Sequence, residues 1–374
     1  MRYYLIAGEA SGDLHGSNLM KGLFAEDQEA DVRFWGGGMM EAVGGVKVRD
    51  YKATAVMGAT DVLRNLGKIS RNLRDCKADI LDWKPDVVIL IDYPGFNMKI
   101  ARFCHERGIR VFYYIAPKTW ASREGRNRKL KAWVDRLFIV FPFEIPYFEQ
   151  RQVPFIYKGN PLVDAVDAHE YSRPVTEKYI AILAGSRKGE IARTMPNAMQ
   201  MADELHAIPE YRDYKFLVAG APSRSREDYD RHIGGRDYVD VVFGRTYDIL
   251  KFADAALINS GTASLEAALI GTPQVVCWST GFITAVLAKY VLRVLDHVKF
   301  ISLGNLILDR PAFRELIQYE FTPEECAAEI RRLIEDSPYR ERMLADYGEI
   351  RQRLGGTGAS RAVAKAMIQC LEEA

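Results

Sequence analysis

Residues 255–273 read AALINSGTASLEAALIGTP and predict a strand that turns directly into a helix. The apolar run 255–258 has the length of a buried strand, and residues 263–270 are rich in Ala and Leu, which favour a helix. The turn between them contains Ser260-Gly261-Thr262. Backbone N–H groups at the start of a helix lack intrahelical partners and lie at the positive end of its dipole. The stretch therefore predicts an anion site with two hydroxyl donors.

Glu266 adds a second feature to this stretch. It follows Thr262 by four residues, which places both on one face of the helix. A carboxylate there repels a phosphate but accepts hydrogen bonds from the two hydroxyls of a sugar. Phosphate followed by ribose describes a nucleotide. The alternative is a capped helix start in which Glu266 is merely solvated.

The strand–helix alternation extends over most of the chain and restarts once. Expected strands cover residues 3–7, 32–35, 46–48, 86–91, 110–115 and 137–141, then 179–183, 215–219, 239–243, 255–258 and 274–278. Strands separated by helices indicate right-handed crossovers and parallel sheets. Residues 160–178, with two prolines and several charges, are interpreted as a linker, and the chain is expected to be helical from residue 322 with a break at Gly355-Gly356.

This pattern predicts an α/β protein with two Rossmann-like doubly wound domains facing a cleft. We expect ligands at the carboxyl ends of the strands. The expected divisions are a first Rossmann-like domain over residues 1–165, a second over residues 178–340, and C-terminal helices over residues 341–374 that pack across the domains.

Composition limits the class of protein. The chain has 374 residues, 48% of them hydrophobic, and a net charge of +1, which gives no electrostatic footprint for bulk nucleic-acid binding. The five cysteines are scattered without a CxxC pair, so neither a disulfide framework nor a zinc site is expected. The N-terminal sequence meets Glu9 after a short apolar run, as a first strand and not a signal peptide does. No apolar run approaches the ~18 residues of a membrane span, so we expect a cytoplasmic protein.

The second half carries a second candidate anion site. Gly185-Ser186-Arg187 follows its first strand, and Glu190 comes one turn later. The guanidinium of Arg187 can bridge phosphate oxygens, so the two turns together suit the diphosphate of a departing nucleotide. No acidic pair of the DxD type lies near either turn, so no metal is expected there. No P-loop sequence occurs, which argues against a P-loop ATPase. The alternative for Arg187 is a surface salt bridge to Glu190.

Asp92 is the candidate general base. It ends the apolar strand 86–91, and a carboxylate at that edge is suitably placed to accept a proton from a hydroxyl. The alternative is that Asp92 caps the following turn before Pro94. His15, one turn inside the first helix, is a rival base.

These residues belong to motifs through which the chain resembles the lipid-A-disaccharide synthases, bacterial glycosyltransferases of family 19 with the two-domain GT-B fold. The resemblance runs nearly end to end. Its motifs are Gly8-Glu9-Ala10-Ser11-Gly12-Asp13, Met57-Gly58, Asp92-Tyr93-Pro94-Gly95-Phe96-Asn97, Pro117 with Trp120-Ala121, Pro142-Phe143-Glu144, Gly185-Ser186-Arg187 with Glu190, Ser260-Gly261-Thr262 with Leu265-Glu266, Ser302-Leu303 with Asn305-Leu306, and Glu315-Leu316 with Gln318. Each motif alone is weak, but nine in the family's order are specific.

The resemblance implies an inverting transfer from UDP-2,3-diacylglucosamine to 2,3-diacylglucosamine 1-phosphate, giving the disaccharide 1-phosphate and UDP. It implies Asp92 as base and no metal or cofactor. The residues expected at the UDP donor are Arg187, Ser186, Glu190, Ser260, Gly261, Thr262, Glu266, Asn305 and Gln318. Those expected on the acceptor side are Ser11, Asp13, Met57, Asn97 and Trp120. A UDP-sugar epimerase of the same fold and a non-catalytic nucleotide-binding module remain alternatives.

Several positions depart from the family pattern. Ser122 ends what is often a Trp-Ala-Trp triplet, Asn160 replaces a common His, Gly304 replaces a common Pro, and Cys277-Trp278 replaces a Val/Gly-Tyr pair. We expect these departures to affect sugar or chain-length preference and not the class of reaction.

Doubly acylated substrates imply access to the inner-membrane surface. Residues 61–74 place apolar side chains on one helical face and four cations on the other, which suits an anionic interface. The alternative is a crossover helix with a solvated outer face. The basic run 123–136 could meet the 1-phosphate or lipid head groups, or be solvated, and residues 281–295 are amphipathic and not membrane-spanning. The family includes dimers that exchange C-terminal parts, which a homodimer of this chain would resemble.

Overall fold

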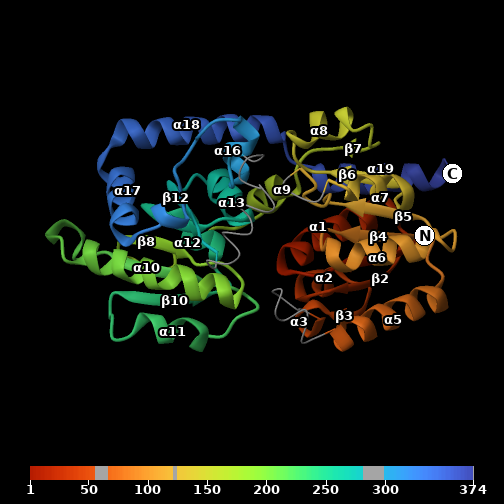
Figure 1. The fold of residues 1–374 in the computed structure, drawn as a ribbon, viewed down its shortest axis with the longest axis horizontal. Helices are drawn as coiled ribbons and strands as arrows, with labels where there is room; N and C mark the ends of the chain where they lie inside the picture. Colours follow the sequence, from red (N-terminus) through yellow and green to blue (C-terminus); the bar gives the residue numbers. More distant parts are fainter. Residues whose placement is uncertain (55–65, 121–123, 281–298, 374) are drawn as a thin grey trace. The chain divides into compact units, whose positions relative to one another are not determined.

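The structure is a computed structural model that describes residues 1–54, 66–120, 124–280 and 299–373. The chain folds as two compact units (Figure 1). Unit 1 comprises Met1–Ala165 and Leu354–Ala374, and unit 2 comprises Val166–Arg353. Each unit is built on a parallel sheet covered by helices, as the strand–helix alternation predicts.

Within the described residues, unit 1 contains a seven-stranded parallel sheet of order β3-β2-β1-β4-β5-β6-β7. Its strands are β1 (Arg2–Ala7), β2 (Asp31–Gly36), β3 (Val46–Asp50), β4 (Val87–Ile91), β5 (Val111–Tyr114), β6 (Arg136–Ile139) and β7 (Ile156–Tyr157). Its helices are α1 (Ala10–Glu26), α2 (Gly38–Val43), α3 (Tyr51–Thr54), α5 (Leu66–Trp83), α6 (Pro94–His105), α7 (Arg126–Trp133), α8 (Glu144–Gln150) and α19 (Ala359–Glu372), and α9 (Pro161–Asp167) crosses the unit boundary. The central strand β4 is buried at every position, as its apolar sequence requires.

The two faces of this sheet are covered differently. Side chains of α5, α6 and α7 pack in one core cluster with β4 and β5. On the other side, α1 lies against α19, as Figure 1 also shows for the dark-blue C-terminal helix. A Cβ at Gly22 would come within 2.9 Å of the Cβ of Ala364, so this helix pair requires a glycine for its close approach. The return of the C-terminal helix to the first domain is thereby confirmed.

Unit 2 contains, within the described residues, a six-stranded parallel sheet of order β10-β9-β8-β11-β12-β13. Its strands are β8 (Tyr179–Leu183), β9 (Lys215–Gly220), β10 (Val239–Phe243), β11 (Ala255–Asn259), β12 (Gln274–Trp278) and β13 (Glu315–Ile317). Its helices are α10 (Lys188–His206), η1 (Pro209–Tyr211), α11 (Glu227–Ile233), α12 (Thr246–Phe252), α13 (Thr262–Ile270), α16 (Leu303–Leu308), η3 (Gln318–Glu320), α17 (Pro323–Glu335) and α18 (Ser337–Leu354). Strands β8 and β11 are central and buried throughout.

The eleven expected strands are confirmed, one expectation about an element was wrong, and two short strands were not predicted. Residues 160–178 are not entirely a linker, because Pro161 begins α9, where proline is compatible with a first helical turn. The short edge strands β7 and β13 were missed because two or three residues carry too little pattern to predict a strand.

Among the residues that the structure describes, no helix is both long and apolar enough to cross a lipid bilayer. Residues 281–295, interpreted from sequence as amphipathic, lie outside the described residues.

Candidate functional site

Asp92 lies at the carboxyl end of β4, in a sharp turn into α6. Both Asp92 and Tyr93 have left-handed backbone conformations, with φ of 44° and 48°. A non-glycine residue in this region is strained, and two in succession persist only where the surroundings hold them. Pro94 then starts α6. The turn therefore resembles the strained strand-to-helix elbows that expose one side chain at a sheet edge.

The backbone of Asp92 is held by three hydrogen bonds. Its carbonyl accepts from the Nδ2 of Asn97 at 2.8 Å and from the hydroxyl of Tyr113 at 2.7 Å, and its N–H donates to the carbonyl of Tyr114 at 3.1 Å. The side chain of Asp92 is half-buried, whereas Asn97 is fully buried. The structure thus places Asn97 beneath the turn, where it supports the backbone that carries the candidate base.

Ser11 and Asp13 lie in the first turns of α1, at the carboxyl end of β1 next to β4. The hydroxyl of Ser11 is half-buried and makes no hydrogen bond within the described residues. Asp13 is buried, and its carboxylate accepts from the N–H of Gly37 at 2.7 Å and of Met40 at 3.1 Å. Asp13 therefore holds the start of α2, while Ser11 is available to a ligand.

His15, the rival base, is buried within α1. Burial lowers the pKa of its imidazole to about 4. His15 is 8% exposed, whereas Asp92 is half-buried at the carboxyl end of its strand. Asp92 is therefore more accessible than His15 to the hydroxyl of a ligand.

Aromatic side chains lie after β5 and β6 of the same sheet. Trp120 is half-buried and meets the ring of Phe143 edge to face, with centroids 5.1 Å apart, and Phe143 stacks on Phe141 at 5.3 Å. Glu144, which sequence reasoning did not single out as a titrating group, is 2% exposed. Burial raises the pKa of its carboxyl group to about 7. Hydrogen bonds from the N–H groups of Phe141 and Val140 lower this pKa, but their effect is smaller than that of burial. An acid next to a strand end, in Pro142-Phe143-Glu144, was the available signal.

Glu190 organises the turn between β8 and α10 in unit 2. Its carboxylate accepts from the N–H of Ser186 at 3.0 Å and of Arg187 at 3.2 Å. The guanidinium of Arg187 also lies 3.3 Å from Glu190, so the ion pair considered as an alternative is present. The two N–H groups expected at a phosphate are therefore bonded to a carboxylate of the same turn.

The turn between β11 and α13 lies beside it. The hydroxyl of Ser260 donates to the carbonyl of Ile301 at 3.3 Å, and Gly261 and Thr262 are half-buried at the start of α13. One turn later, Glu266 accepts a hydrogen bond of 2.9 Å from the hydroxyl of Tyr247. The expected sequence of small residues, helix start and carboxylate is thus present in the fold.

Asn259 joins the two turns, although sequence reasoning did not single it out. Its Nδ2 donates to the Oγ1 of Thr194 on α10 at 2.8 Å and to the carbonyl of Ala184 at 3.3 Å. Strands β8 and β11 are hydrogen-bonded neighbours, with Leu183 opposite Ile258. The structure therefore brings together the two turns that the sequence separates by more than seventy residues. A polar residue that ends an otherwise apolar strand was the available signal.

Asn305 and Gln318 lie in the walls of this region. Asn305 is fully buried, and its amide donates to Glu315 at 2.9 Å and accepts from the N–H of Ala312 at 2.8 Å. Gln318 is half-buried, and its amide binds both the N–H and the carbonyl of Thr280, at 2.6 and 3.3 Å. Both side chains fix neighbouring backbone, and Asn305 offers no exposed atom to a ligand.

Two departures from the family pattern have structural roles here. Asn160 is buried, donates to the carbonyl of Val140 at 2.9 Å and accepts from the N–H of Leu162 at 2.9 Å, which starts α9. A Cβ at Gly304 would come within 2.8 Å of the ring of Phe313. Met57 and Ser122 lie outside the described residues. Among the residues described, no group of three or more His, Cys, Asp or Glu side chains is arranged to hold a metal ion.

Comparison of the sequence with known families gives a match over almost the whole chain. A family model described as Lipid-A-disaccharide synthetase matches residues 3–367. A lipid-A-disaccharide synthase of Geobacter metallireducens is 36% identical over 380 residues, covering 99% of this chain and 97% of the relative. The enzyme of the same name from Myxococcus xanthus is 36% identical over 381 residues, covering 99% and 97%.

Comparison of the fold gives solved structures of low sequence identity. A putative UDP-N-acetylglucosamine 2-epimerase from Listeria monocytogenes has a TM-score of 0.72 at 14% identity, covering 100% of this chain and 97% of that one. A UDP-GlcNAc 2-epimerase from Neisseria meningitidis, solved with UDP-GlcNAc bound, has a TM-score of 0.71 at 13% identity, covering 99% and 100%. These likenesses and the two parallel sheets identify a GT-B glycosyltransferase-like fold.

Proposed function

The chain belongs to the lipid-A-disaccharide synthetase family and is a glycosyltransferase of lipid A biosynthesis, and we propose that it joins UDP-2,3-diacylglucosamine to 2,3-diacylglucosamine 1-phosphate with inversion at the transferred sugar. Unit 2 would bind the nucleotide sugar, and unit 1 would bind the acceptor and supply the base. In this proposal Asp92, in unit 1, is the base, and the two candidate phosphate turns, in unit 2, hold the nucleotide.

The observation that carries the proposal is the adjacency of those two turns. Asn259 ties them together, so small residues and helix starts meet at neighbouring strand ends. In the proposal, the Arg187 guanidinium and the hydroxyls of Ser186, Ser260 and Thr262 hold the diphosphate. Gly261 lets the phosphate approach the backbone. Four further residues are expected at the nucleotide sugar. Glu190 shapes its turn and Glu266 meets the ribose. Asn305 and Gln318 support the backbone around the site.

The acceptor would bind along the carboxyl edge of the first sheet. Asp92 stands there on a strained, firmly bonded turn, which is where a proton acceptor is expected. Ser11 offers a hydroxyl that makes no hydrogen bond to any described residue, and Trp120 offers an aromatic edge. Asp13 and Asn97 hold the surrounding backbone. Met57 stays a candidate on the acceptor side by resemblance alone.

The chemical step follows from these roles. The 6-hydroxyl oxygen of the acceptor attacks C1 of the donor sugar, and the Asp92 carboxylate takes the hydroxyl proton. The bond between C1 and the diphosphate oxygen breaks, and its electron pair leaves with UDP. Attack on the face opposite the leaving group converts an α linkage into a β linkage. Arg187 and the N–H groups at the start of α13 stabilise the negative charge on the departing diphosphate.

Access to acylated substrates requires contact with the inner-membrane surface. Exposed cations on α5 (Lys68, Arg71, Arg74) and on α7 (Arg128, Lys129, Lys131) are the candidates for anionic head groups. The inner face of α5 packs on the sheet through Cys76 and Ile80, as a crossover helix does, so only its outer face is offered. A peripheral, cytoplasmic-side location and a homodimer complete the proposal.

The deciding experiment is an assay of the purified full chain with both acylated substrates in detergent. UDP and the disaccharide 1-phosphate should appear in equal amounts, and neither should form without the acceptor. Release of a 2-epimer from the donor alone would instead show a UDP-sugar epimerase, the activity named for the neighbours of similar fold. Tight UDP binding without turnover would show a nucleotide-binding module and contradict the proposal.

A further inference from the structure

Glu266 is held from one side only. It lies on α13, half-buried, and its Oε1 accepts a hydrogen bond of 2.9 Å from the hydroxyl of Tyr247 on α12. Its Oε2 has no hydrogen-bond partner within the described part of the chain. Burial raises the pKa of Glu266, and the hydrogen bond from Tyr247 lowers it again in part. Tyr247 thus favours the ionised form of the carboxylate that can accept from hydroxyls.

Tyr247 can act only as the donor in this pair. Burial and the neighbouring charge of Glu266 raise the pKa of its hydroxyl far above the usual 10. The phenol therefore keeps its proton at any physiological pH. With that proton directed at one carboxylate oxygen, the other oxygen is left to accept from a ligand.

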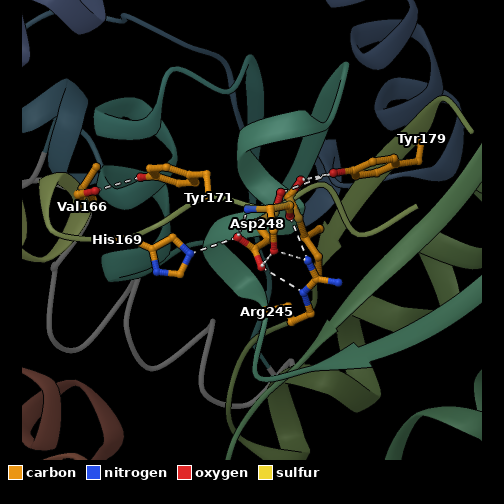
Figure 2. A network of polar contacts seen from close by, with 8 residues as sticks. Val166, His169, Tyr171, Tyr179, Arg245 and Asp248 are labelled. Atoms are coloured by element: carbon orange, nitrogen blue, oxygen red, sulfur yellow. Dashed lines mark hydrogen bonds and ion pairs between the residues drawn. The ribbon is translucent and has the colours of Figure 1, made fainter. Parts of the chain in front are cut away.

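Tyr247 itself is fixed by a polar network around the next residue, Asp248. Figure 2 shows the side chain of His169 directed at Asp248, and its Nε2 lies 3.0 Å from the Asp248 carboxylate. The His169 ring also meets the Tyr247 ring edge to face, with centroids 5.3 Å apart. Asp248 also accepts from the N–H of Ser172 at 3.0 Å and from the Nε of Arg245 at 2.9 Å. Although burial opposes it, these hydrogen bonds lower the pKa of Asp248 to about 2. The ring of Tyr247 thus packs against a histidine that is anchored by a permanently charged carboxylate.

We propose that Tyr247 is a positioning residue for nucleotide recognition, which orients Glu266 so that its free oxygen accepts from the ribose hydroxyls of the UDP moiety. This inference rests on the proposed function, in which Glu266 binds the ribose of the nucleotide sugar. It adds that Tyr247 orients the Glu266 carboxylate. An oriented carboxylate binds a ligand with both ribose hydroxyls more tightly than a ligand that lacks one of them, because the missing hydroxyl leaves a carboxylate oxygen without its hydrogen bond. Tyr247 would therefore determine how strongly the site prefers ribose over deoxyribose.

The test compares the dissociation constants of UDP and 2′-deoxy-UDP by calorimetry on the full chain. The unmodified protein should prefer UDP by roughly tenfold, the value of one hydrogen bond to a charged group. Tyr247→Phe removes only the hydroxyl. It should weaken UDP binding by roughly five- to tenfold and leave 2′-deoxy-UDP binding nearly unchanged, so that the ratio of the two constants approaches one.

Tyr171→Phe is the matched control. Tyr171 also contacts the His169 ring, with centroids 4.8 Å apart, and its hydroxyl donates to the carbonyl of Val166 at 3.0 Å (Figure 2). This variant loses a phenolic hydrogen bond from the same region but none to Glu266. It should keep the ratio of the unmodified protein. A general loosening of this region would lower the preference for ribose in both variants and overturn the inference.

Glu266→Gln separates this inference from the proposed function. If it leaves the ratio unchanged, Glu266 does not meet the ribose, and both proposals about this carboxylate fail. If it abolishes the preference while Tyr247→Phe keeps it, only the role of Tyr247 fails. Should Tyr247→Phe not fold, Tyr247→Leu tests the same hydrogen bond, and a retained ribose preference in that variant also contradicts the inference.

Discussion

The ring of Tyr93 lies directly over Gly8, so close that a Cβ at position 8 would come within 2.2 Å of its Cδ1. Gly8 directly follows β1 and Tyr93 follows Asp92, so this contact joins the first turn of the chain to the turn that carries the candidate base. Side-chain space, and not backbone conformation, explains the glycine here, since Gly8 has no positive φ.

Gly8→Ala should therefore displace Tyr93 and, through it, Asp92. Overpacking of a tight contact typically costs ~1–3 kcal/mol, so we expect lower stability in urea and a fall in kcat of at least tenfold. Gly95→Ala is the control, because a Cβ at Gly95 meets nothing within 4 Å. Equal kcat values in the two variants would show that the contact does not position Asp92.

Asp92→Asn should abolish proton acceptance while keeping the shape of the turn. Loss of a general base typically costs ~10²–10⁴ in rate, and we expect kcat to fall within this range while the dissociation constant of UDP stays unchanged. Asp86→Asn, at the start of the same strand, where Asp86 accepts from the N–H of Arg2 at 2.7 Å, is the control. If Asp92→Asn had the kcat of the unmodified protein, Asp92 would not be the base and would serve only to shape the turn.

Arg187→Ala should weaken donor binding. Arg187 would make a charge-assisted contact to the diphosphate in a partly exposed site. Loss of this contact should raise the dissociation constant of UDP about tenfold, or by ~1.4 kcal/mol. Lys188→Ala removes the same charge from the next residue, whose ammonium lies 3.6 Å from Asp228, and should change UDP binding little. Equal losses in the two variants would indicate a diffuse effect of charge and not a contact.

Glu190→Gln tests whether Glu190 shapes its turn or opposes the phosphate. The amide oxygen of glutamine can still accept from the N–H groups of Ser186 and Arg187, while the negative charge is removed. We expect UDP to bind at least as tightly as to the unmodified protein. Glu190→Ala, which removes the acceptor as well, should weaken UDP binding. If both variants bind UDP poorly, the charge of Glu190 itself is required.

Glu144 should make stability depend on pH. Its pKa rises from 4.5 to about 7 on folding, so the native state holds the proton more tightly and loses stability as pH rises through that interval. Glu144→Gln has no such loss. We expect the variant to exceed the unmodified protein by ~3 kcal/mol in unfolding free energy at pH 8 and by nearly nothing at pH 4.5.

Urea unfolding at several pH values measures this difference. His15, whose pKa falls to about 4 on folding, acts in the opposite direction between pH 4 and 6.5, and it acts equally in both proteins. The difference between the two proteins therefore isolates Glu144. A constant difference across the pH range would show that Glu144 is not the titrating group.

Local patterns in the chain were enough to predict all the described strands except β7 and β13, the two parallel sheets, and the turns at Asp92, Gly185 and Ser260. Apolar runs of strand length and glycine-rich helix starts are properties of neighbouring residues, so they can be read without knowledge of the fold. The same holds for Glu266, whose place one helical turn after Thr262 follows from helix periodicity alone.

The partners of these residues depended on the tertiary structure. Asn259 reaches Thr194, Tyr247 reaches Glu266 and Gly8 lies beneath Tyr93, and each pair is separated by many residues of sequence. Strand order and helix packing decide which of many distant side chains meet, and no local pattern contains that information. For the same reason Asp13, Asn97 and Asn305 look like ligand contacts in the sequence, but their burial and backbone hydrogen bonds make them supports.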